Sequence, residues 1–455
     1  MGKLPAYLKD VKKIGFFGLG TSNSEIAKII AKQTNAEIIL RSDGKVSQRE
    51  LPHFLKNAKI YDGERSCEGI DEDVLILSPS VKRSRREIID AKARGVRLTS
   101  DAELFFDTCR SDVFAVSGSD GKSTTTELAS RLFASGYGAV HKSGNCGVAM
   151  TPFALSEESG DAHVVELSSF MLEYFEPRTR RAVITGISEN HLDWHGSFDG
   201  YIRAKERIYR RTDGAVVWAD GEITRGFLRK YPAYAVLSRK YTDEDLRPFG
   251  AEIRICVFGG EILINGEPVL KLSDIRRRES HNVENLMSAM ALSYGYYGRE
   301  ELLSVAREFS GIGHRAESVG TFFGVEYIDS SIDSTPARTI TTLKGLSRRV
   351  ILLLGGRGKG LSYKPLAPHA LRWASAVILT GENRGEIKRA LEECETHATS
   401  GTKIYEVEDF DEAVRTARAI AREGDTVLLS PASTSYDRFK NFEERSHQFR
   451  KIISE

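Results

Sequence analysis

The chain has 455 residues, of which 28% are charged and 40% are hydrophobic, and its formal net charge is +1. This composition is ordinary for a globular protein, and the near-zero charge excludes a general affinity for nucleic acid or for anionic membranes. The length predicts about three domains of ~100–200 residues each.

The first predicted strand, residues 13–17, leads through the turn Gly18-Leu19-Gly20 into an amphipathic helix. Further strands at 37–40 and 74–77 make the first 109 residues a small Rossmann-like β-α-β domain. The turn resembles a dinucleotide-binding G-x-G turn, but the third glycine of that fingerprint is missing. A tight turn without a ligand is therefore the alternative. Ligands of such folds bind beyond the carboxyl ends of the strands, where the candidate contacts are Thr21, Ser22 and Ser42.

A second domain is expected to start at residue 110 with a phosphate-binding loop. An apolar strand at 113–116 is followed by S-G-S-D-G-K-S-T, residues 117–124, and by a predicted helix over 124–135. Glycines let the backbone bring its N–H groups onto a phosphate, and the helix N-terminus adds partial positive charge. Lys122 is then expected to reach the outer phosphates and Ser123 to ligate magnesium. Val116 stands where the longer G-x-x-x-x-G-K loop has its first glycine, and a plain turn before a helix is the alternative.

Three more polar side chains follow buried elements of this second domain. A strand from residue 163 carries Glu166 near its end, where an acid can meet magnesium. His191 follows the predicted strand 182–187, and Lys205 lies on a predicted helix over 197–211. The plainer alternatives are a surface carboxylate, a capping histidine and a solvated lysine. The segment 253–270 predicts antiparallel hairpins, and residues 281–285 open a further helix.

A third domain, again Rossmann-like, is expected to follow the glycine-containing hinge 311–315. Its strands are predicted at 326–329, 350–354, 376–379 and 426–429, with helices between them. They end in D-S-S, G-G-R-G-K-G and S-P-A-S-T-S, which should meet at one edge of the sheet. The predicted fold is therefore α/β with three domains: a Rossmann-like domain 1–109, a central P-loop ATPase-type domain 110–311 and a Rossmann-like domain 312–455.

The cysteines and the N-terminus predict a cytoplasmic protein. The five cysteines are scattered without a C-x-x-C pair, which argues against a zinc site or a disulfide framework. The first ten residues lack the apolar core of a signal peptide, and no run reaches the ~20 apolar residues of a membrane span. We expect neither a membrane nor a nucleic-acid partner, and a monomer.

Taken together, these motifs resemble the Mur ligases. They are, in order, G-S-D-G-K-S-T, G-N, E-L-S-S-F-x-L-E, E-N-H-L-D, Y-x-x-A-K-x-R-I-Y, H-N-x-x-N and G-H-R-x-E. The C-terminal stretch from L-S-P-A to D-R-F-K-N-F-E resembles the member that adds D-glutamate, and the resemblance covers essentially the whole chain. It implies an ATP-dependent ligase that joins D-glutamate to UDP-N-acetylmuramoyl-L-alanine through an acyl phosphate, in cytoplasmic peptidoglycan precursor synthesis.

The resemblance also implies a role for each matching residue. The expected ATP contacts are Gly118, Ser119, Asp120, Gly121, Lys122, Ser123, Thr124, Asn285, Arg315 and Asp329. Two magnesium ions would be held by Ser123, Glu166, His191 and Lys205, with Lys205 carrying a carbamate formed from CO2. The catalytic groups would be Lys122, His191 and Lys205. The expected UDP-sugar contacts are Thr21, Ser22, Ser42 and Asn145, and the expected D-glutamate contacts are Lys359, Ser435 and Phe442.

The chain departs from the family pattern at two places. The family usually has D-S-K-A-T-N after the aspartate of the third domain, whereas this chain has D-S-S-I-D-S, with Ser331 and Asp333. The residue before His191, usually acidic, is Asn190. Alternatives are a related ligase for another amino acid, a nucleotide-binding partner subunit that does not ligate, and a dehydrogenase based only on Gly18 and Gly20.

Overall fold

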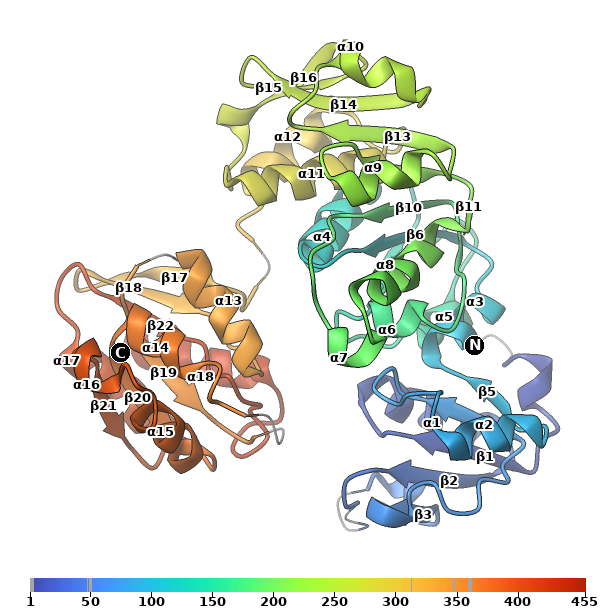
Figure 1. Cartoon of the computed structure of the whole chain (residues 1–455), viewed down its shortest axis with the longest axis horizontal. Coiled ribbons are helices and arrows are strands. Elements are labelled where there is room, and N and C mark those ends of the chain that lie inside the picture. Colours follow the sequence, from blue (N-terminus) through green and yellow to red (C-terminus); the bar gives the residue numbers. More distant parts are fainter. Residues whose placement is uncertain (1–3, 47, 49–50, 312, 347, 359–361) are drawn as a thin grey trace. The chain divides into compact units, whose positions relative to one another are not determined.

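The computed structural model describes residues 4–46, 48, 51–311, 313–346, 348–358 and 362–455. The chain divides into two compact units, Met1–Phe309 and Ser310–Glu455 (Figure 1). No helix of the described residues combines the length and the apolar character required to span a bilayer.

The first sheet of the N-terminal unit has five parallel strands in the order β3-β2-β1-β4-β5 (Figure 1). Side chains of α1 pack with Phe16 on one face, and Ile88 of α2 packs with Phe17 on the other. The predicted β-α-β pattern is confirmed, and the edge strands were not predicted. The elements are β1 (Lys13–Phe17), α1 (Thr21–Gln33), β2 (Glu37–Ser42), β3 (Lys59–Asp62), β4 (Val74–Leu77), α2 (Arg86–Ala93), β5 (Arg97–Thr99) and α3 (Asp101–Thr108).

The second sheet of this unit has nine strands in the order β16-β15-β14-β13-β12-β10-β6-β8-β7. The strands from β7 to β14 run parallel, and β15 and β16 add the two predicted antiparallel hairpins. The strands are β6 (Asp112–Ser117), β7 (Val140–Gly144), β8 (Ala162–Glu166), β10 (Arg181–Ile184), β12 (Ala215–Trp218), β13 (Ala233–Ser238), β14 (Ile253–Phe258), β15 (Glu261–Ile264) and β16 (Glu267–Lys271). A separate pair consists of β9 (Arg178–Thr179) and β11 (Arg211–Thr212).

Helices cover both faces of the nine-stranded sheet. Phe114 and Val116 of β6 face a core that includes α4 and α11, whereas Val113 and Ala115 face a core that includes α3 and α5. The helices that follow β6 are α4 (Lys122–Phe133), α5 (Thr151–Ser156), α6 (Ser169–Leu172), α7 (Leu192–His195), α8 (Phe198–Glu206), α9 (Glu222–Leu228), α10 (Asp243–Leu246), α11 (Ser280–Leu292) and α12 (Arg299–Glu308).

Two predicted boundaries of elements that pack in or on this sheet are wrong, one of a helix and one of a strand. The predicted helix over 197–211 ends at Glu206 and continues as a 3-10 turn, Arg207–Tyr209. The Tyr209 hydroxyl there bonds the N–H of Ile184 and the carbonyl of Val216, so strand contacts fix this turn. The predicted strand 182–187 ends at Ile184, because Thr185 and Gly186 turn their polar groups to the phosphate loop instead.

The C-terminal unit contains one sheet in the order β17-β18-β22-β19-β20-β21, in which only the β17–β18 pair is antiparallel. The four strands predicted here are confirmed as β18, β19, β20 and β22. The strands are β17 (Glu317–Phe322), β18 (Val325–Asp329), β19 (Val350–Gly355), β20 (Ala374–Thr380), β21 (Lys403–Glu406) and β22 (Thr426–Leu429). The helices are α13 (Pro336–Leu346), α14 (Ala367–Trp373), α15 (Arg384–Glu392), α16 (His397–Ser400), α17 (Phe410–Ile420) and α18 (Phe442–Ser454).

Candidate active site

The phosphate loop joins β6 to α4 in a conformation that requires its two glycines. Gly118 has φ +145°, and a Cβ there would lie 2.0 Å from Thr185 Oγ1. Gly121 has φ +80° at the N-cap of α4, and a Cβ there would lie 2.2 Å from Asn285 Oδ1. Only glycine accepts both the positive φ and the close approach, which confirms the strand–loop–helix geometry predicted for this stretch.

Lys122 lies at the first position of α4, and its Nζ bends back over the loop. It donates to the carbonyl oxygens of Gly118 at 2.9 Å and Ser119 at 2.8 Å. The amine is thus held at the mouth of the loop, where phosphate oxygens would compete for the same protons. Ser123 and Thr124 follow with half-buried side chains, and Asp120 is exposed.

Ser119 and Asp120 tie the loop to the end of β10. The Ser119 hydroxyl accepts a hydrogen bond from the Ser188 N–H at 2.9 Å and lies 2.9 Å from the Tyr201 hydroxyl. The Ser119 N–H donates to the Gly186 carbonyl at 2.8 Å, and Thr185 Oγ1 donates to the Asp120 carbonyl. These contacts fix the loop against the residues that follow β10 and against α8.

Lys205 of α8 is 1% exposed and joins the same loop. Its Nζ donates to the Gly118 carbonyl at 2.7 Å and to Ser117 Oγ at 3.3 Å. Burial and the nearby Lys122 cation hold the pKa of the Lys205 amine well below its usual value. No carboxylate of the described residues lies within ion-pair distance of the Lys205 Nζ, and the burial of the side chain contradicts the alternative of a solvated lysine.

Glu166 ends β8 beside the loop and is 1% exposed. Its Oε1 accepts a hydrogen bond from Asn145 Nδ2 at 2.7 Å, whereas Oε2 has no hydrogen-bond partner among the described residues. A buried carboxylate oxygen without a partner is costly. A divalent cation bound at this oxygen would remove that cost, and oxygen is the donor that magnesium prefers. The residues therefore fit the predicted metal. The side chain of Asn145, an expected UDP-sugar contact, hydrogen-bonds Glu166.

His191 is the residue before α7 and has a left-handed backbone, with φ +52°. Its ring lies 4.7 Å from the ring of Phe170, and the residue is exposed. Partial burial lowers the pKa of the imidazole, and the Lys205 and Lys122 cations lower it further. A neutral imidazole is the form that ligates a metal. Asn190, the departure from the family pattern, accepts the N–H of His191 through Oδ1 at 2.9 Å.

Asn285 reaches the loop from α11, 160 residues away from its partner Thr125. The Thr125 hydroxyl donates to Asn285 Oδ1 at 3.3 Å. Arg315 and Asp329 belong to the C-terminal unit. Asp329 is fully buried at the end of β18 and accepts hydrogen bonds from His314 Nδ1, Arg450 Nη2, the Ser446 hydroxyl and the Ser331 N–H. A nucleotide contact at Asp329 would have to replace one of these donors.

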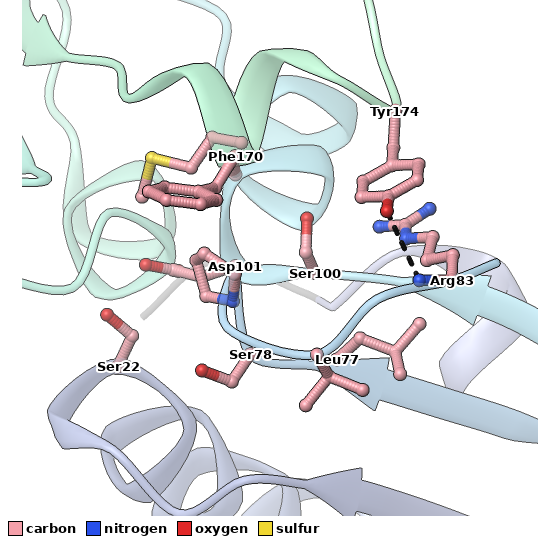
Figure 2. Close-up of a pocket in the computed structure, with 12 residues that line it drawn as sticks. Ser22, Leu77, Ser78, Arg83, Ser100, Asp101, Phe170 and Tyr174 are labelled. Atoms are coloured by element: carbon pink, nitrogen blue, oxygen red, sulfur yellow. Dashed lines mark hydrogen bonds between the residues drawn. The ribbon is translucent and has the colours of Figure 1, made fainter. Parts of the chain in front are cut away.

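The expected UDP-sugar residues are only partly brought together. Ser22 lines a pocket between the two sheets of the N-terminal unit, with Asp101 and Phe170 around it (Figure 2). Ser42 lies at the end of β2 and accepts the Gly44 N–H, outside this lining. Thr21 begins α1. The sequence reasoning missed most of the lining, which consists of Ser22, Leu77, Ser78, Pro79, Val81, Arg83, Ser100, Asp101, Ala102, Phe170, Met171 and Tyr174.

Of the expected D-glutamate residues, Lys359 lies outside the described residues. Ser435 is buried after β22, and Phe442 begins α18 and accepts the Ser331 hydroxyl through its carbonyl at 2.9 Å. The departure Asp333 is a structural contact, because its Oδ2 accepts the hydroxyls of Thr342 and Ser430, both at 2.7 Å.

Arg445 of α18 was missed by the sequence reasoning. Its Nε donates to Ser331 Oγ at 3.0 Å, and its Nη2 donates to the Ser331 carbonyl at 2.8 Å and to the Ser433 carbonyl at 3.2 Å. Burial lowers the pKa of this guanidinium to about 10. Its hydrogen-bond acceptors among the described residues are neutral, and the carboxylates of Asp437, Asp329 and Asp333 act on the guanidinium through space and raise its pKa.

The described residues contain two clusters of metal-type side chains apart from the loop: His314 with Glu317 and Asp329, and Cys109 with Glu157 and His163. Glu157 already accepts hydrogen bonds from the Cys109 thiol, from His163 Nε2 and from the N–H groups of Arg110 and Ser111. His163 Nδ1 is buried without a partner among the described residues, although a metal-bound histidine normally donates through its second nitrogen. Glu157 and His163 Nε2 are thus hydrogen-bonded to each other and to their neighbours, and the unpartnered Nδ1 argues against His163 as a metal ligand.

Comparison with known proteins identifies the family. Residues 13–86 match the MurD N-terminal domain, 116–293 the Mur ligase middle domain and 314–433 the Mur ligase, glutamate ligase domain. UDP-N-acetylmuramoylalanine–D-glutamate ligase of Clostridium novyi is 32% identical over 97% of this chain and 96% of its own length. The enzyme of the same name from Acetivibrio thermocellus is 33% identical over 99% of this chain and 98% of its own.

Solved structures give the same fold. The UDP-N-acetylmuramate–alanine ligase MurC of Thermotoga maritima has a TM-score of 0.57 at 20% identity, covering 97% of this chain and 98% of its own. The murein peptide ligase of Psychrobacter arcticus has a TM-score of 0.52 at 16% identity, covering 97% and 98%. One edge of the nine-stranded sheet carries the phosphate loop and the buried Glu166, with the buried Lys205 beside them. With these residues and the relatives above, the chain belongs to the Mur ligase family, and within it to the UDP-N-acetylmuramoylalanine–D-glutamate ligases.

Proposed function

We propose that this chain joins D-glutamate to UDP-N-acetylmuramoyl-L-alanine at the expense of ATP, in the synthesis of peptidoglycan precursors. The observation that carries the proposal is the full-length identity of 32–33% to ligases of that name. The chain supplies a formed phosphate loop and a buried, partly unsatisfied carboxylate for this chemistry. We place the reaction in the cytoplasm and expect a monomer.

The phosphate loop holds ATP in this proposal. Residues 118–124 donate N–H groups to the phosphates, and Lys122 exchanges its loop carbonyls for phosphate oxygens. Asn285, Arg315 and Asp329 contact the rest of the nucleotide. Charge builds on the phosphoryl oxygens during transfer, and a fixed cation lowers the energy of that state more than it lowers the ground state.

Glu166 and Ser123 are the oxygen donors for one magnesium ion, and His191 and Lys205 serve a second. Magnesium supplies charge neutralisation of the transferring phosphoryl group. An unmodified ammonium at Lys205 would be repelled by such an ion, whereas a carbamate turns the residue into an oxygen ligand. Carbamate formation needs the neutral amine, which the lowered pKa of the Lys205 amine favours.

The two other substrates meet different parts of the chain. Ser22, with Thr21, Ser42 and Asn145, faces the UDP-sugar in this proposal, and Lys359, Ser435 and Phe442 hold D-glutamate. The carboxylate of the L-alanyl group attacks the γ-phosphate, displaces ADP and gives an acyl phosphate. The amine of D-glutamate then attacks the acyl carbon, phosphate leaves, and the nitrogen loses a proton to form the amide. The protein needs no covalent nucleophile for these steps; it positions the reactants and excludes water from the acyl phosphate.

An amino-acid panel tests the proposal. Purified enzyme with ATP, magnesium and UDP-N-acetylmuramoyl-L-alanine should release ADP with D-glutamate and far less with L-glutamate, lysine or diaminopimelate. Preference for one of the other amino acids would identify a related ligase of the same family. ADP release without any dependence on the UDP-sugar would overturn the ligase assignment.

A further inference from the structure

Lys82 connects the five-stranded sheet to the segment that carries His191. It lies on the loop after β4, and its Nζ donates to the Asp193 carbonyl at 3.2 Å. The same Nζ lies 4.9 Å from the centroid of the Trp194 ring. Both partners belong to α7, which starts directly after His191. A carbonyl and a π face together hold this ammonium in one place.

The next residue of the loop anchors it a second time. The Arg83 N–H donates to the Tyr174 hydroxyl at 3.2 Å, and its guanidinium lies 4.7 Å from the Tyr174 ring and pairs with Glu103 (Figure 2). Arg83 and Tyr174 both line the pocket that Ser22 also lines. The loop that forms one wall of the pocket is therefore the loop that carries Lys82.

An aromatic layer continues from this pocket to His191. Phe170 lines the pocket, and its ring lies 4.8 Å from the Trp194 ring and 4.7 Å from the His191 ring. Trp194 is fixed on a third side, because its Nε1 donates to Glu173 Oε2 at 2.5 Å. His191 has a left-handed backbone, so its conformation depends on how well these neighbours hold α7.

We propose that Lys82 is a positioning residue. It couples occupation of the pocket lined by Ser22, here called the sugar pocket, to the placement of His191. The contact to α7 transmits the position of the pocket loop to the residue before that helix. The proposal rests on the function assigned above, in which His191 serves the metal site. Lys82 touches no reacting atom in this arrangement, and water can replace it at the exposed Asp193 carbonyl. Its loss should therefore change geometry rather than folding, and small misplacements of reacting groups cost large factors in rate.

The first test compares Lys82→Met and Lys82→Arg with Lys59→Met. Lys59 offers a matched control because its Nζ lies 5.1 Å from the Tyr61 ring centroid on the far edge of the same sheet. We expect Lys82→Met to lower kcat about tenfold, with the KM values for ATP and D-glutamate within twofold of wild type and an unchanged melting temperature. Lys82→Arg should restore most of the rate, and Lys59→Met should match wild type. A wild-type kcat in Lys82→Met would overturn the proposal, as would a loss that follows the melting temperature and is not restored by arginine.

The second test uses the fluorescence of Trp194, one of three tryptophans in the chain. The difference between the emission of wild type and of Trp194→Phe isolates its signal without altering the buried Trp218. Adding UDP-N-acetylmuramoyl-L-alanine without ATP should change this signal, and Lys82→Met should abolish the change. A wild-type enzyme without ligase activity would refute the proposed function. An active enzyme whose Trp194 signal responds equally with and without Lys82 would refute the coupling alone.

Discussion

At the scale of single residues, two lysines that share one acceptor lie in different environments. Lys122 and Lys205 both donate to the Gly118 carbonyl, but Lys122 is half-buried at the loop mouth and Lys205 is 1% exposed beneath it. The accessible cation suits phosphate. The buried amine, whose pKa is lowered by burial and by the Lys122 cation, suits chemical modification.

Lys122→Ala should reduce ligase turnover by about 10²–10³-fold, the usual effect of removing one charge-stabilising donor. The side chain packs no core, so the melting temperature should change little. ADP release and a thermal melt measure the two quantities. Lys142→Ala is the control, since Lys142 pairs with Glu127 on the surface. Turnover near the wild-type rate in Lys122→Ala would show that the loop does not hold the phosphates.

Lys205→Arg should abolish activity, because a guanidinium cannot form the carbamate and does not ligate magnesium. Wild-type activity should fall in CO2-depleted buffer and return with bicarbonate, measured by ADP release. Full activity of the arginine variant, or indifference of the wild type to CO2, would contradict the carbamate.

At the scale of elements, the site depends on contacts between parts that are distant in sequence. Gly121 of the phosphate loop and Asn285 of α11 approach so closely that no side chain fits between them. In the C-terminal unit, His314 of the hinge segment bonds Asp329 at the end of β18 and lies 2.7 Å from the Ser446 hydroxyl of α18. These contacts order the strand ends at which the predicted ligand residues lie.

Gly121→Ala should lower stability by about 1–2 kcal/mol through its positive φ alone, and should also displace Asn285 and weaken ATP binding. Gly226→Ala in α9 is the matched control, since a Cβ there meets nothing within 4 Å and alanine favours helix. Urea unfolding and the KM for ATP measure both effects. Equal behaviour of the two variants would contradict the steric argument.

The His314–Asp329 contact predicts a pH-dependent stability. The hydrogen bond to Asp329 raises the pKa of His314 in the folded chain. The contribution of this contact to the free energy of unfolding is therefore complete below the unfolded pKa of ~6.5, and it is lost as pH rises through the higher folded pKa. Asp329 keeps a lowered pKa and stays ionised throughout this range. The stability difference between wild type and His314→Gln should therefore be larger at pH 5.5 than at pH 9, measured by urea unfolding. The same stability difference at both pH values would contradict the stabilising contact between protonated His314 and Asp329.

At the scale of the whole molecule, the residues expected to contact different substrates are divided between two compact units. The phosphate loop and the pocket lined by Ser22 belong to the unit Met1–Phe309, and the residues expected for D-glutamate belong to Ser310–Glu455. A change at one of the expected D-glutamate residues should therefore affect the amino acid more than ATP, whose expected contacts in the second unit are other residues, Arg315 and Asp329.

Lys359→Ala should raise the KM for D-glutamate tenfold or more, which is about 1.4 kcal/mol per tenfold change. The physical reason is that a substrate carboxylate without its cation is left desolvated and unpaired. The KM for ATP should stay within about twofold of wild type. Steady-state kinetics measure both, with Lys364→Ala as the control because Lys364 pairs with Glu393 on the surface. Equal increases in both KM values would contradict the assignment of Lys359 to the amino acid.

The sequence by itself determined the elements whose signals are local. The phosphate loop, most of the predicted strands and the hairpins around Gly259-Gly260 and Asn265-Gly266 follow from apolar runs and turn residues, and the structure confirms them. The order of the motifs also predicted the family, because they follow one another along this chain in the order and spacing typical of the Mur ligases. Strands β3, β5, β7, β17 and β21 escaped prediction, since short, partly exposed strands lack a clear apolar pattern. The strands β12 and β13 were also missed, although their apolar residues are buried.

Only the tertiary structure decided which side chains meet. No local pattern distinguishes Arg445 from a solvated helical arginine, but folding buries it against the ends of β18 and β22. Asp333 likewise becomes a structural acceptor only when α13 and β22 come together. The contact between Lys82 and Trp194 spans more than a hundred residues. Such contacts arise from packing between distant segments, which side-chain periodicity along the chain does not encode.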